Sequence, residues 1–326
     1  MNNEITEIVL KENGFEAFNS MQEEALKKDL FEKSLLIAAP TSSGKTMVAE
    51  MLALNTAMNK EGKTLYIAPL KALATEHYKE FKKKYEKYGL NAALSTGDLD
   101  SGSKYLSKYN VIFLTTEKLD SLLRHEAAWL EDTKLLIVDE IHELDSSRGP
   151  TLEIVIAKMM SINSSLQVLG LSATINNSDE IAEWLNAELV KSNYRPVKLS
   201  EGTYYDGLIY DKDYKKEEIN EDGEPIDALI KFVLKKEKQM LCFVNSRKST
   251  ITLAEKLGKV VERKLSEEER KDLKKIANEA LNVLESPTEQ CRKLAGCVER
   301  GSAFHHAGLM PKQKELVEES FRNKKN

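Results

Sequence analysis

A short loop between a predicted strand and a predicted helix carries the residues with the clearest chemistry. Residues 35–38 form an apolar run bounded by turn residues, and apolar residues recur at helical spacing from Met47 onward. In this position the N–H groups of a loop can surround a polyphosphate, and the positive end of the helix dipole faces it. Lys45 can reach the terminal phosphates, and the hydroxyl of Thr46 can coordinate Mg²⁺. The whole loop consists of Ala39, Pro40, Thr41, Ser42, Ser43, Gly44, Lys45 and Thr46.

The loop also has a simpler interpretation, a turn before a helix with an exposed lysine. Ala39 stands where the phosphate-binding pattern usually has its first glycine, although a small residue still lets the backbone approach a ligand. Patterns of this kind also arise by chance, so further residues are needed to establish a nucleotide site.

A pair of carboxylates follows the apolar run at residues 135–138, which is typical of a central parallel strand covered on both faces. Ligands bind at the carboxyl ends of parallel strands, so Asp139 and Glu140 are expected beside the loop. Asp139 can hold Mg²⁺, and Glu140 can orient or deprotonate an attacking water molecule. The alternative is a strand followed by an acidic helix cap.

Gln22 lies at the entry of a predicted helix over residues 21–30. Asn19 and Ser20 are expected to cap this helix, with Glu23 as the capping-box partner. The amide of Gln22 can donate and accept in one plane, which suits the edge of an adenine ring. An ordinary exposed helix glutamine is the alternative.

Small hydroxyl residues follow another predicted strand at residues 166–171. Ser172 and Thr174, on either side of Ala173, could bond the carboxylates near Asp139 and respond to the nucleotide state. A turn stabilised by serine and threonine hydroxyls is the plain alternative.

The composition is that of a globular protein. With 326 residues, 41% of them hydrophobic, the chain should hold about two domains. The net charge of −5 does not resemble a small basic nucleic-acid module, so such contacts would need a local patch. The three cysteines, Cys242, Cys291 and Cys297, are odd in number and form no C-x-x-C pair, which favours reduced thiols in a cytosolic or nuclear-type compartment. No apolar run is long enough for a signal peptide or a membrane span.

The pattern of elements predicts two α/β units. Residues 1–200 alternate strands and helices, residues 201–225 read as a linker or hairpin, and residues 226–326 begin a second unit. The second unit offers strands only at 239–244 and 301–304, with a charged helical stretch between them, so it is expected to be incomplete. In the first unit, helix 71–88 carries a row of lysines, which we interpret as a solvated face, with nucleic-acid contact as the alternative. These lysines are Lys82, Lys83, Lys84 and Lys87.

Together, the quoted segments and several others resemble the ordered motifs of superfamily 2 DExH-box helicases. The motifs are residues 39–46, 69–73, 96–98, 115–118, 139–142, 172–174, 243–247 and 304–309. Their flanks, especially residues 148–153 and the helical stretch before Phe304, resemble the superkiller-like group and, within it, archaeal fork-repair DNA helicases related to the helicase domain of polymerase theta. The resemblance covers essentially the whole chain and implies tandem RecA-like parallel-sheet domains, the second incomplete.

The resemblance implies a role for each motif. Gln22 would read adenine, while Lys45, Thr46, Asp139 and Glu140 would bind and hydrolyse Mg-ATP. Residues that would couple hydrolysis to strand movement are His142, Ser172, Ala173 and Thr174. Residues that would contact nucleic acid, chiefly through phosphates and so independently of sequence, are Pro69, Leu70, Lys71, Gly97, Thr116, Lys118, Asn245, Ser246, Arg247 and His306. The implied activity is ATP-dependent 3′–5′ translocation on single-stranded or forked DNA in repair of stalled forks, in the cytoplasm at the nucleoid.

Two alternatives stay open, an RNA helicase of the same group and a non-catalytic fragment that binds nucleotide or nucleic acid. The later motifs of the family, including the stretch that carries the arginine finger, do not occur before Asn326. An arginine finger contributes about 10³ to 10⁵ in rate. We therefore expect this chain alone to bind ATP but hydrolyse it weakly, with a second chain or a further C-terminal region supplying the finger.

Overall fold

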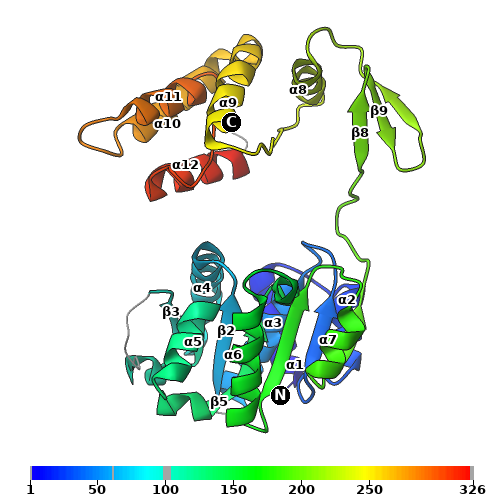
Figure 1. Cartoon of the computed structure of the whole chain (residues 1–326), viewed down its shortest axis with the longest axis vertical. Helices are drawn as coiled ribbons and strands as arrows, with labels where there is room; N and C mark the ends of the chain where they lie inside the picture. Colours follow the sequence, from blue (N-terminus) through cyan, green and yellow to red (C-terminus); the bar gives the residue numbers. More distant parts are fainter. Residues whose placement is uncertain (1, 61, 98–103, 324–326) are drawn as a thin grey trace. The chain divides into compact units, whose positions relative to one another are not determined.

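A computed structural model describes residues 2–60, 62–97 and 104–323 (Figure 1). Its contacts divide the chain into unit 1, residues 1–199, and unit 2, residues 200–326. Asp98, in one of the expected nucleic-acid motifs, lies outside the described residues. No helix among the described residues is long and apolar enough to cross a membrane.

Unit 1 contains, among its described residues, a parallel sheet of seven strands in the order β3-β4-β2-β5-β6-β1-β7. The strands are β1 (Leu35–Ala38), β2 (Lys63–Ala68), β3 (Ala92–Ser95), β4 (Val111–Thr115), β5 (Thr133–Val138), β6 (Gln167–Ser172) and β7 (Glu188–Lys191). The α/β prediction with a parallel sheet is therefore confirmed, and β5 is its central strand. Strand β7 was not predicted from the sequence; it lies at the edge beside β1, where Leu36 pairs with Leu189.

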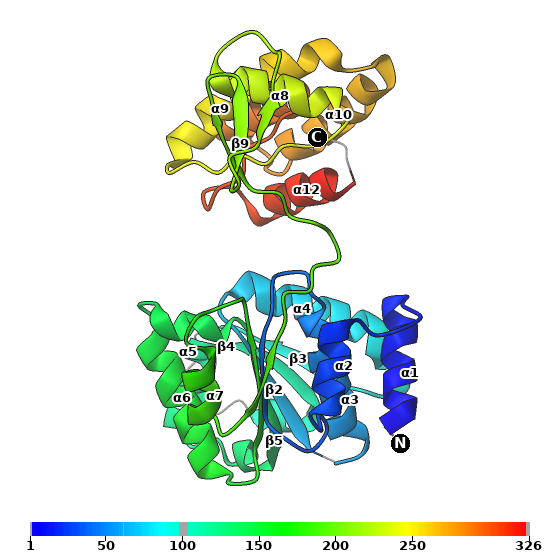
Figure 2. The same ribbon diagram turned by 90° about the vertical axis from the view of Figure 1, so that its right-hand side faces the viewer.

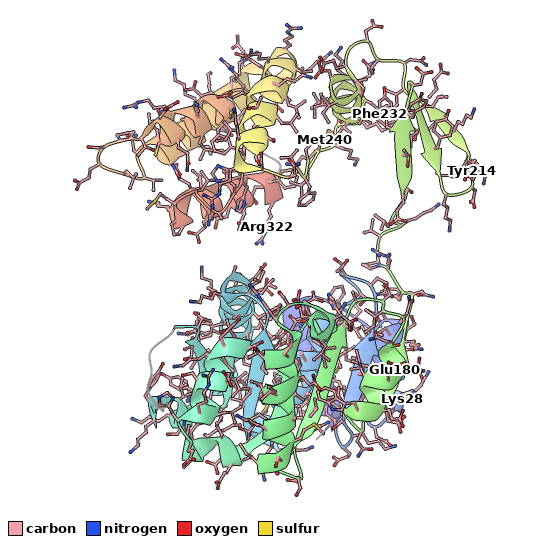
Figure 3. All side chains as sticks on the ribbon, in the orientation of Figure 1. Lys28, Glu180, Tyr214, Phe232, Met240 and Arg322 are labelled. Atoms are coloured by element: carbon pink, nitrogen blue, oxygen red, sulfur yellow. The ribbon has the colours of Figure 1, made fainter. Side chains whose placement is uncertain are left out.

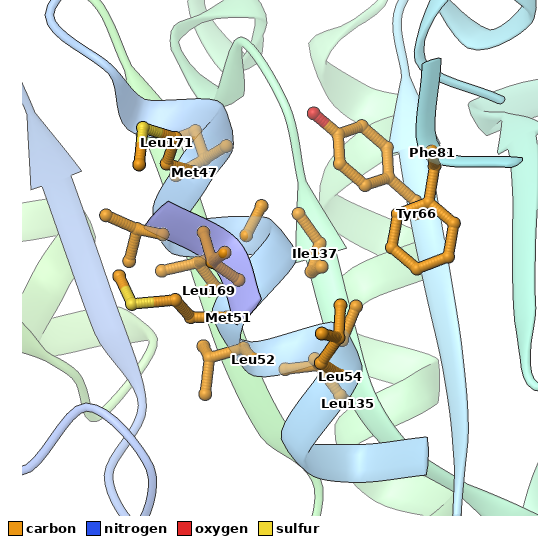
Figure 4. Close-up of a cluster of buried hydrophobic side chains, with 14 of the residues drawn as sticks. Met47, Met51, Leu52, Leu54, Tyr66, Phe81, Leu135, Ile137, Leu169 and Leu171 are labelled. Atoms are coloured by element: carbon orange, nitrogen blue, oxygen red, sulfur yellow. The ribbon is translucent and has the colours of Figure 1, made fainter. Parts of the chain in front are cut away.

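Helices cover both faces of this sheet (Figure 2). One face carries α1 (Asn2–Asn13), α2 (Ser20–Lys27), α3 (Lys45–Met58) and α4 (Lys71–Tyr85), and the other carries α5 (Thr116–Arg124), α6 (Gly149–Ile162) and α7 (Ser178–Trp184). Successive residues of a strand point to opposite faces, so each strand feeds two cores. Leu135 and Ile137 pack toward α3 (Figure 4), whereas Leu136 and Val138 pack toward the helices of the other face. Each such buried side chain contributes roughly 1.5–3 kcal/mol.

The cap of α2 differs from the prediction. Asn19, with an extended backbone at φ −81°, is the N-cap residue, and its side chain accepts from the N–H groups of Met21 and Gln22. Ser20 is already helical, so Gln22 rather than Glu23 occupies the third helical position and completes the capping box.

Three of the four lysines of the predicted helix 71–88 are exposed, namely Lys82, Lys83 and Lys87, and Lys84 is half-buried. Lys84 donates to Glu50 at 2.7 Å and to Asn13 at 3.0 Å, which links α4 to α3 and α1. Lys87 pairs with Glu12 at 2.6 Å. The solvated face predicted for these lysines therefore holds except at Lys84, which is half-buried because Glu50 and Asn13 reach its ammonium group.

Unit 2 combines a small antiparallel sheet with helices. The sheet has the order β10-β9-β8 and contains β8 (Gly202–Tyr205), β9 (Leu208–Asp211) and β10 (Lys216–Glu218). The helices are α8 (Pro225–Lys235), α9 (Arg247–Val261), α10 (Glu267–Leu281), α11 (Glu289–Val298) and α12 (Pro311–Arg322). Residues from α9 to α12 share one apolar core with Phe304.

The two strands expected in unit 2 do not form among its described residues. The segment 239–244, which contains Met240 (Figure 3), connects α8 to α9 without strand pairing. Met240 and Cys242 pack on the unit, but Leu241 and Phe243 are 65% and 89% exposed. A parallel strand needs hydrogen-bonded neighbours and cover on both faces. Among the described residues, no strand pairs with this segment, and nothing covers the face that carries Leu241 and Phe243. The same lack of a paired neighbour leaves residues 301–304 outside any strand.

Candidate nucleotide-binding site

The loop of residues 39–46 joins the carboxyl end of β1 to the first turn of α3. Ala39 donates its N–H to the carbonyl of Ser172 at 3.1 Å, so the loop starts directly beside β6. Gly44 is the N-cap of α3 and has φ +89°, and a Cβ there would lie 2.5 Å from Nε2 of Gln22. Glycine is therefore required for both conformation and space. No side chain caps α3 and its first turn holds no acidic residue, so its positive end is open to an anion.

Lys45 lies within this loop. Its Nζ donates to the carbonyl oxygens of Ala39 at 2.7 Å and Pro40 at 3.1 Å. Burial lowers the pKa of Lys45, against the nearby charges of Glu140 and Asp139. Among the described residues, this ammonium group bonds only neutral carbonyl oxygens. A phosphate would add a direct attraction between opposite charges.

Asp139 follows β5 and is held from several sides. Its Oδ2 accepts from Nε2 of His77 at 3.0 Å and from the hydroxyl of Tyr66 at 3.2 Å. Its Oδ1 accepts from the N–H of Glu140 at 3.0 Å. Burial opposes protonation of His77, but the hydrogen bond to Asp139 and the charges of Asp139, Glu80 and Glu76 together outweigh it and raise the pKa of the imidazole. Burial and Asp139 also raise the pKa of Tyr66, so its hydroxyl stays a donor.

Glu140 has an uncommon backbone conformation. Its φ of +50° lies in the left-handed region, which costs a non-glycine residue about 1–3 kcal/mol and is often found at functional sites. Burial, together with the charge of Asp139, raises the pKa of Glu140. A raised pKa makes a carboxylate a better proton acceptor near neutral pH. His142 lies next to it, with Nδ1 3.4 Å from Oε2 of Glu140.

The predicted coupling residues start at the same edge of the sheet. Ser172 ends β6, between β5 and β1, and is fully buried, and its hydroxyl has no hydrogen-bond partner among the described residues. Ala173 is half-buried, and Thr174 is exposed. The expected bond from the hydroxyl of Ser172 to a carboxylate does not occur between described residues.

Gln22 is buried rather than exposed, with 2% of its surface accessible. Its Nε2 donates to the carbonyl of Gly44 at 3.1 Å, and its Oε1 accepts from the N–H of Asn19 at 3.0 Å. Asn19 in turn donates to the carbonyl of Ser43 at 2.9 Å. The exposed-glutamine alternative was therefore wrong, and α2 supports the loop directly. The adenine-reading role stays a prediction.

The predicted nucleic-acid residues of unit 1 follow β2, β3 and β4, so they lie at the same carboxyl edge of the sheet. Leu70 and Gly97 are exposed. The carbonyl of Pro69 accepts from Nη1 of Arg148 at 2.9 Å, and Lys71 begins α4. Thr116 and Lys118 are buried in the first turn of α5, which Thr115 caps.

In unit 2, the predicted nucleic-acid residues gather around the N-terminus of α9. Ser246 caps this helix, and Asn245, immediately before it, is exposed. A Cβ added at Gly308 would lie 3.2 Å from His306 and 3.5 Å from Nη1 of Arg247, so both side chains border the same glycine. Burial and the charge of Arg247 lower the pKa of His306. This leaves a neutral imidazole beside an exposed cation.

The donor set at the loop fits Mg²⁺ with a nucleotide. The described residues contain no group of three or more histidine, cysteine, aspartate or glutamate side chains suited to a metal. Mg²⁺ needs no such group, since it commonly takes one or two protein oxygens and completes its shell with phosphates and water. Thr46 and Asp139 supply such oxygens. The hydroxyl of Ser43, buried with no described partner, is a further polar group of the loop.

His77, Tyr66 and Asn19 are site residues that sequence reasoning missed. No local sequence pattern relates His77 or Tyr66 to Asp139. For Asn19 a signal existed, because Asn-x-x-Gln is itself a capping-box spacing.

Comparison with known proteins agrees with this geometry. Residues 19–181, half of the chain, match the family model described as DEAD/DEAH box helicase. Similar proteins include those named ATP-dependent DNA helicase Hel308 from Methanocaldococcus jannaschii (44% identical), Pyrococcus horikoshii (44%) and Methanococcus vannielii (41%). The alignments cover 97%, 96% and 97% of this chain, but only 27%, 42% and 43% of those proteins. The chain thus belongs to the DEAD/DEAH box helicase family.

Proposed function

We propose that this chain forms part of the motor of an ATP-dependent DNA helicase, which moves 3′ to 5′ on single-stranded DNA and unwinds forked substrates at stalled forks. The names of the similar proteins support the DNA substrate. Because the chain spans less than half of their length, the activity of the whole proteins comes to it only as a proposal. A DNA substrate would place the protein in the cytoplasm at the nucleoid.

The single observation that carries the proposal is the meeting of the open N-terminus of α3 with Asp139 and Glu140 at one edge of the sheet. Lys45 and the N–H groups of the loop would bind the phosphates. Thr46 and Asp139 would hold Mg²⁺, which neutralises phosphate charge when bound. Glu140 would orient the attacking water, and its raised pKa would make it a better acceptor for the proton of that water.

Single-stranded nucleic acid would lie along the carboxyl edge of the sheet in unit 1 and contact Arg247 in unit 2. Contacts of this kind go chiefly to phosphates and weaken as salt rises. Binding of DNA and RNA single strands of equal length and sequence to the 326-residue chain tests the substrate class. Tighter binding of RNA would contradict the proposal and favour an RNA helicase.

Replacing Lys45 by alanine tests the nucleotide site. This change removes a charge-assisted hydrogen-bond donor, and such bonds contribute roughly 1.5–3 kcal/mol. The affinity for ATP should therefore fall about 10- to 100-fold. Binding is measured by titration of a fluorescent ATP analogue, with folding checked by circular dichroism. Lys158→Ala, at an exposed position of α6, is the matched control and should bind as the wild type does. Unchanged affinity in Lys45→Ala would disprove the assignment of the loop.

A further inference from the structure

We propose that His77 is a positioning residue for Asp139: the Nε2–H group of His77, together with the hydroxyl of Tyr66, fixes the carboxylate in the orientation that binds Mg²⁺. The inference rests on the proposed function, since it concerns the same metal site. His77 follows the motif at residues 69–73 and lies in none of the helicase motifs.

The contacts around Asp139 support this role. The Nε2 atom of His77 lies 3.0 Å from Oδ2, and the two side chains are only 16% and 11% exposed. The hydroxyl of Tyr66 lies 3.2 Å from the same oxygen. The rings of His77 and Tyr66 contact each other, with centroids 5.0 Å apart. Three elements, α4, β2 and the end of β5, therefore determine the orientation of one carboxylate.

The position of His77 on α4 is otherwise one for an apolar side chain. Phe81, one turn further on, is buried in the core of this face, and Leu73, one turn before, packs against it. Burying an imidazole here costs free energy unless its nitrogens are hydrogen-bonded. Asp139 provides the hydrogen-bond partner of Nε2. Contact with this carboxylate therefore explains why a histidine, rather than an apolar residue, occupies position 77.

The second nitrogen of the ring is also consistent with this arrangement. Nδ1 is buried and has no partner among the described residues. His77 lines a small cavity of about 10 Å³ together with Thr46, Glu50, Tyr66 and Glu80. This is room for about one water molecule. A water bonded to Nδ1 would leave Nε2 committed to Asp139.

Residues that orient a metal ligand act on metal affinity rather than on nucleotide contacts. Their replacement typically weakens metal binding about 10- to 100-fold. His77 should therefore affect the Mg²⁺-dependent part of nucleotide binding and leave the Mg²⁺-free part unchanged. A residue that only packs the core would change stability without separating these two quantities.

The experiment compares three variants of the 326-residue chain. His77→Gln keeps an N–H donor near the place of Nε2, His77→Asn moves the donor toward the place of Nδ1, and His77→Leu removes it. A fluorescent ADP analogue is titrated with Mg²⁺ and, separately, bound in EDTA. We expect His77→Leu and His77→Asn to weaken Mg²⁺ in the ternary complex about 10- to 100-fold, while His77→Gln stays close to wild type. Affinity in EDTA should be the same in all four proteins.

Two controls separate this inference from the function on which it rests. Asn and Gln variants both bury an amide, so a difference between them reports donor position rather than folding, which is checked by thermal melting. Wild-type Mg²⁺ affinity in His77→Leu and His77→Asn, or an equal loss in His77→Gln, would overturn the positioning role. By contrast, wild-type Mg²⁺ affinity in Asp139→Ala would overturn the metal site itself.

Discussion

Unit 1 and unit 2 each contain a short apolar run, residues 135–138 in the first and 239–244 in the second. Residues 135–138 form most of β5, and each of them is fully buried. In the second run, Met240 and Cys242 pack on the core of unit 2, whereas Leu241 and Phe243 point to solvent. The same kind of sequence is thus a central strand in one unit and a half-covered extended segment in the other.

The difference lies in the neighbours. Leu136 pairs with Leu65 of β2 on one side and with Val168 of β6 on the other, and helices cover both faces. No described strand pairs with residues 239–244. Strand formation is therefore a property of the assembled sheet, because packing and pairing, more than intrinsic preference, stabilise a strand.

Hydrogen exchange should show the largest contrast between the two runs. Amides of Leu135–Val138 open only when the sheet opens, whereas those of 240–244 lack ladder bonds. We expect protection factors at least about a thousandfold higher in β5, since opening free energies range from near zero to the global stability. Exchange is measured by mass spectrometry of peptic fragments. Equal protection would show that residues 239–244 are paired in solution, and the comparison would fail.

Truncation of one side chain in each run should give a smaller but clear contrast. Ile137→Ala leaves a cavity in the core and should lower the free energy of unfolding by about 2–5 kcal/mol. Phe243→Ala removes an 89% exposed ring and should change it by less than about 0.5 kcal/mol. Urea unfolding followed by fluorescence reports on unit 1, which holds both tryptophans, Trp129 and Trp184. Circular dichroism follows the helices of both units, so a transition that it shows and that fluorescence lacks reports on unit 2. A cost above 2 kcal/mol for Phe243→Ala would mean that its ring is covered in solution.

The sequence predicts most of unit 1 because its central strands are apolar runs between turn residues. β7 was missed because two of its four residues are charged and only Val190 is buried. An edge strand needs few apolar side chains, so its pattern is weak. At residues 239–244 a strand was predicted that does not form. An apolar run in the sequence does not show whether a neighbouring strand is present to pair with it.

The site divides in a similar way. The loop and the pair Asp139–Glu140 could be predicted together because both follow parallel strands, whose carboxyl ends share one edge. The hydrogen-bond partners of Asp139, His77 and Tyr66, could not be predicted from the sequence. They depend on β2 lying beside β5 and on which side of α4 faces the sheet. Burial of Gln22 likewise depends on where α2 lies relative to Gly44. Contacts between side chains on different elements have no local signature.

The smallest expected contrast concerns two capping boxes. Asn19 and Gln22 form a part-buried box at α2, and Ser266 and Glu269 form an exposed one at α10. Ser266→Ala should lower stability by about 0.5–2 kcal/mol and leave nucleotide affinity unchanged. Asn19→Ala should cost a similar amount and also weaken ATP binding roughly two- to tenfold, since it removes the bond that holds the carbonyl of Ser43. Urea unfolding and titration with a fluorescent ATP analogue measure the two effects on the same proteins. If Asn19→Ala lost stability but bound ATP as tightly as Ser266→Ala, the side chain of Asn19 would only cap α2, and its bond to Ser43 would not help to shape the loop.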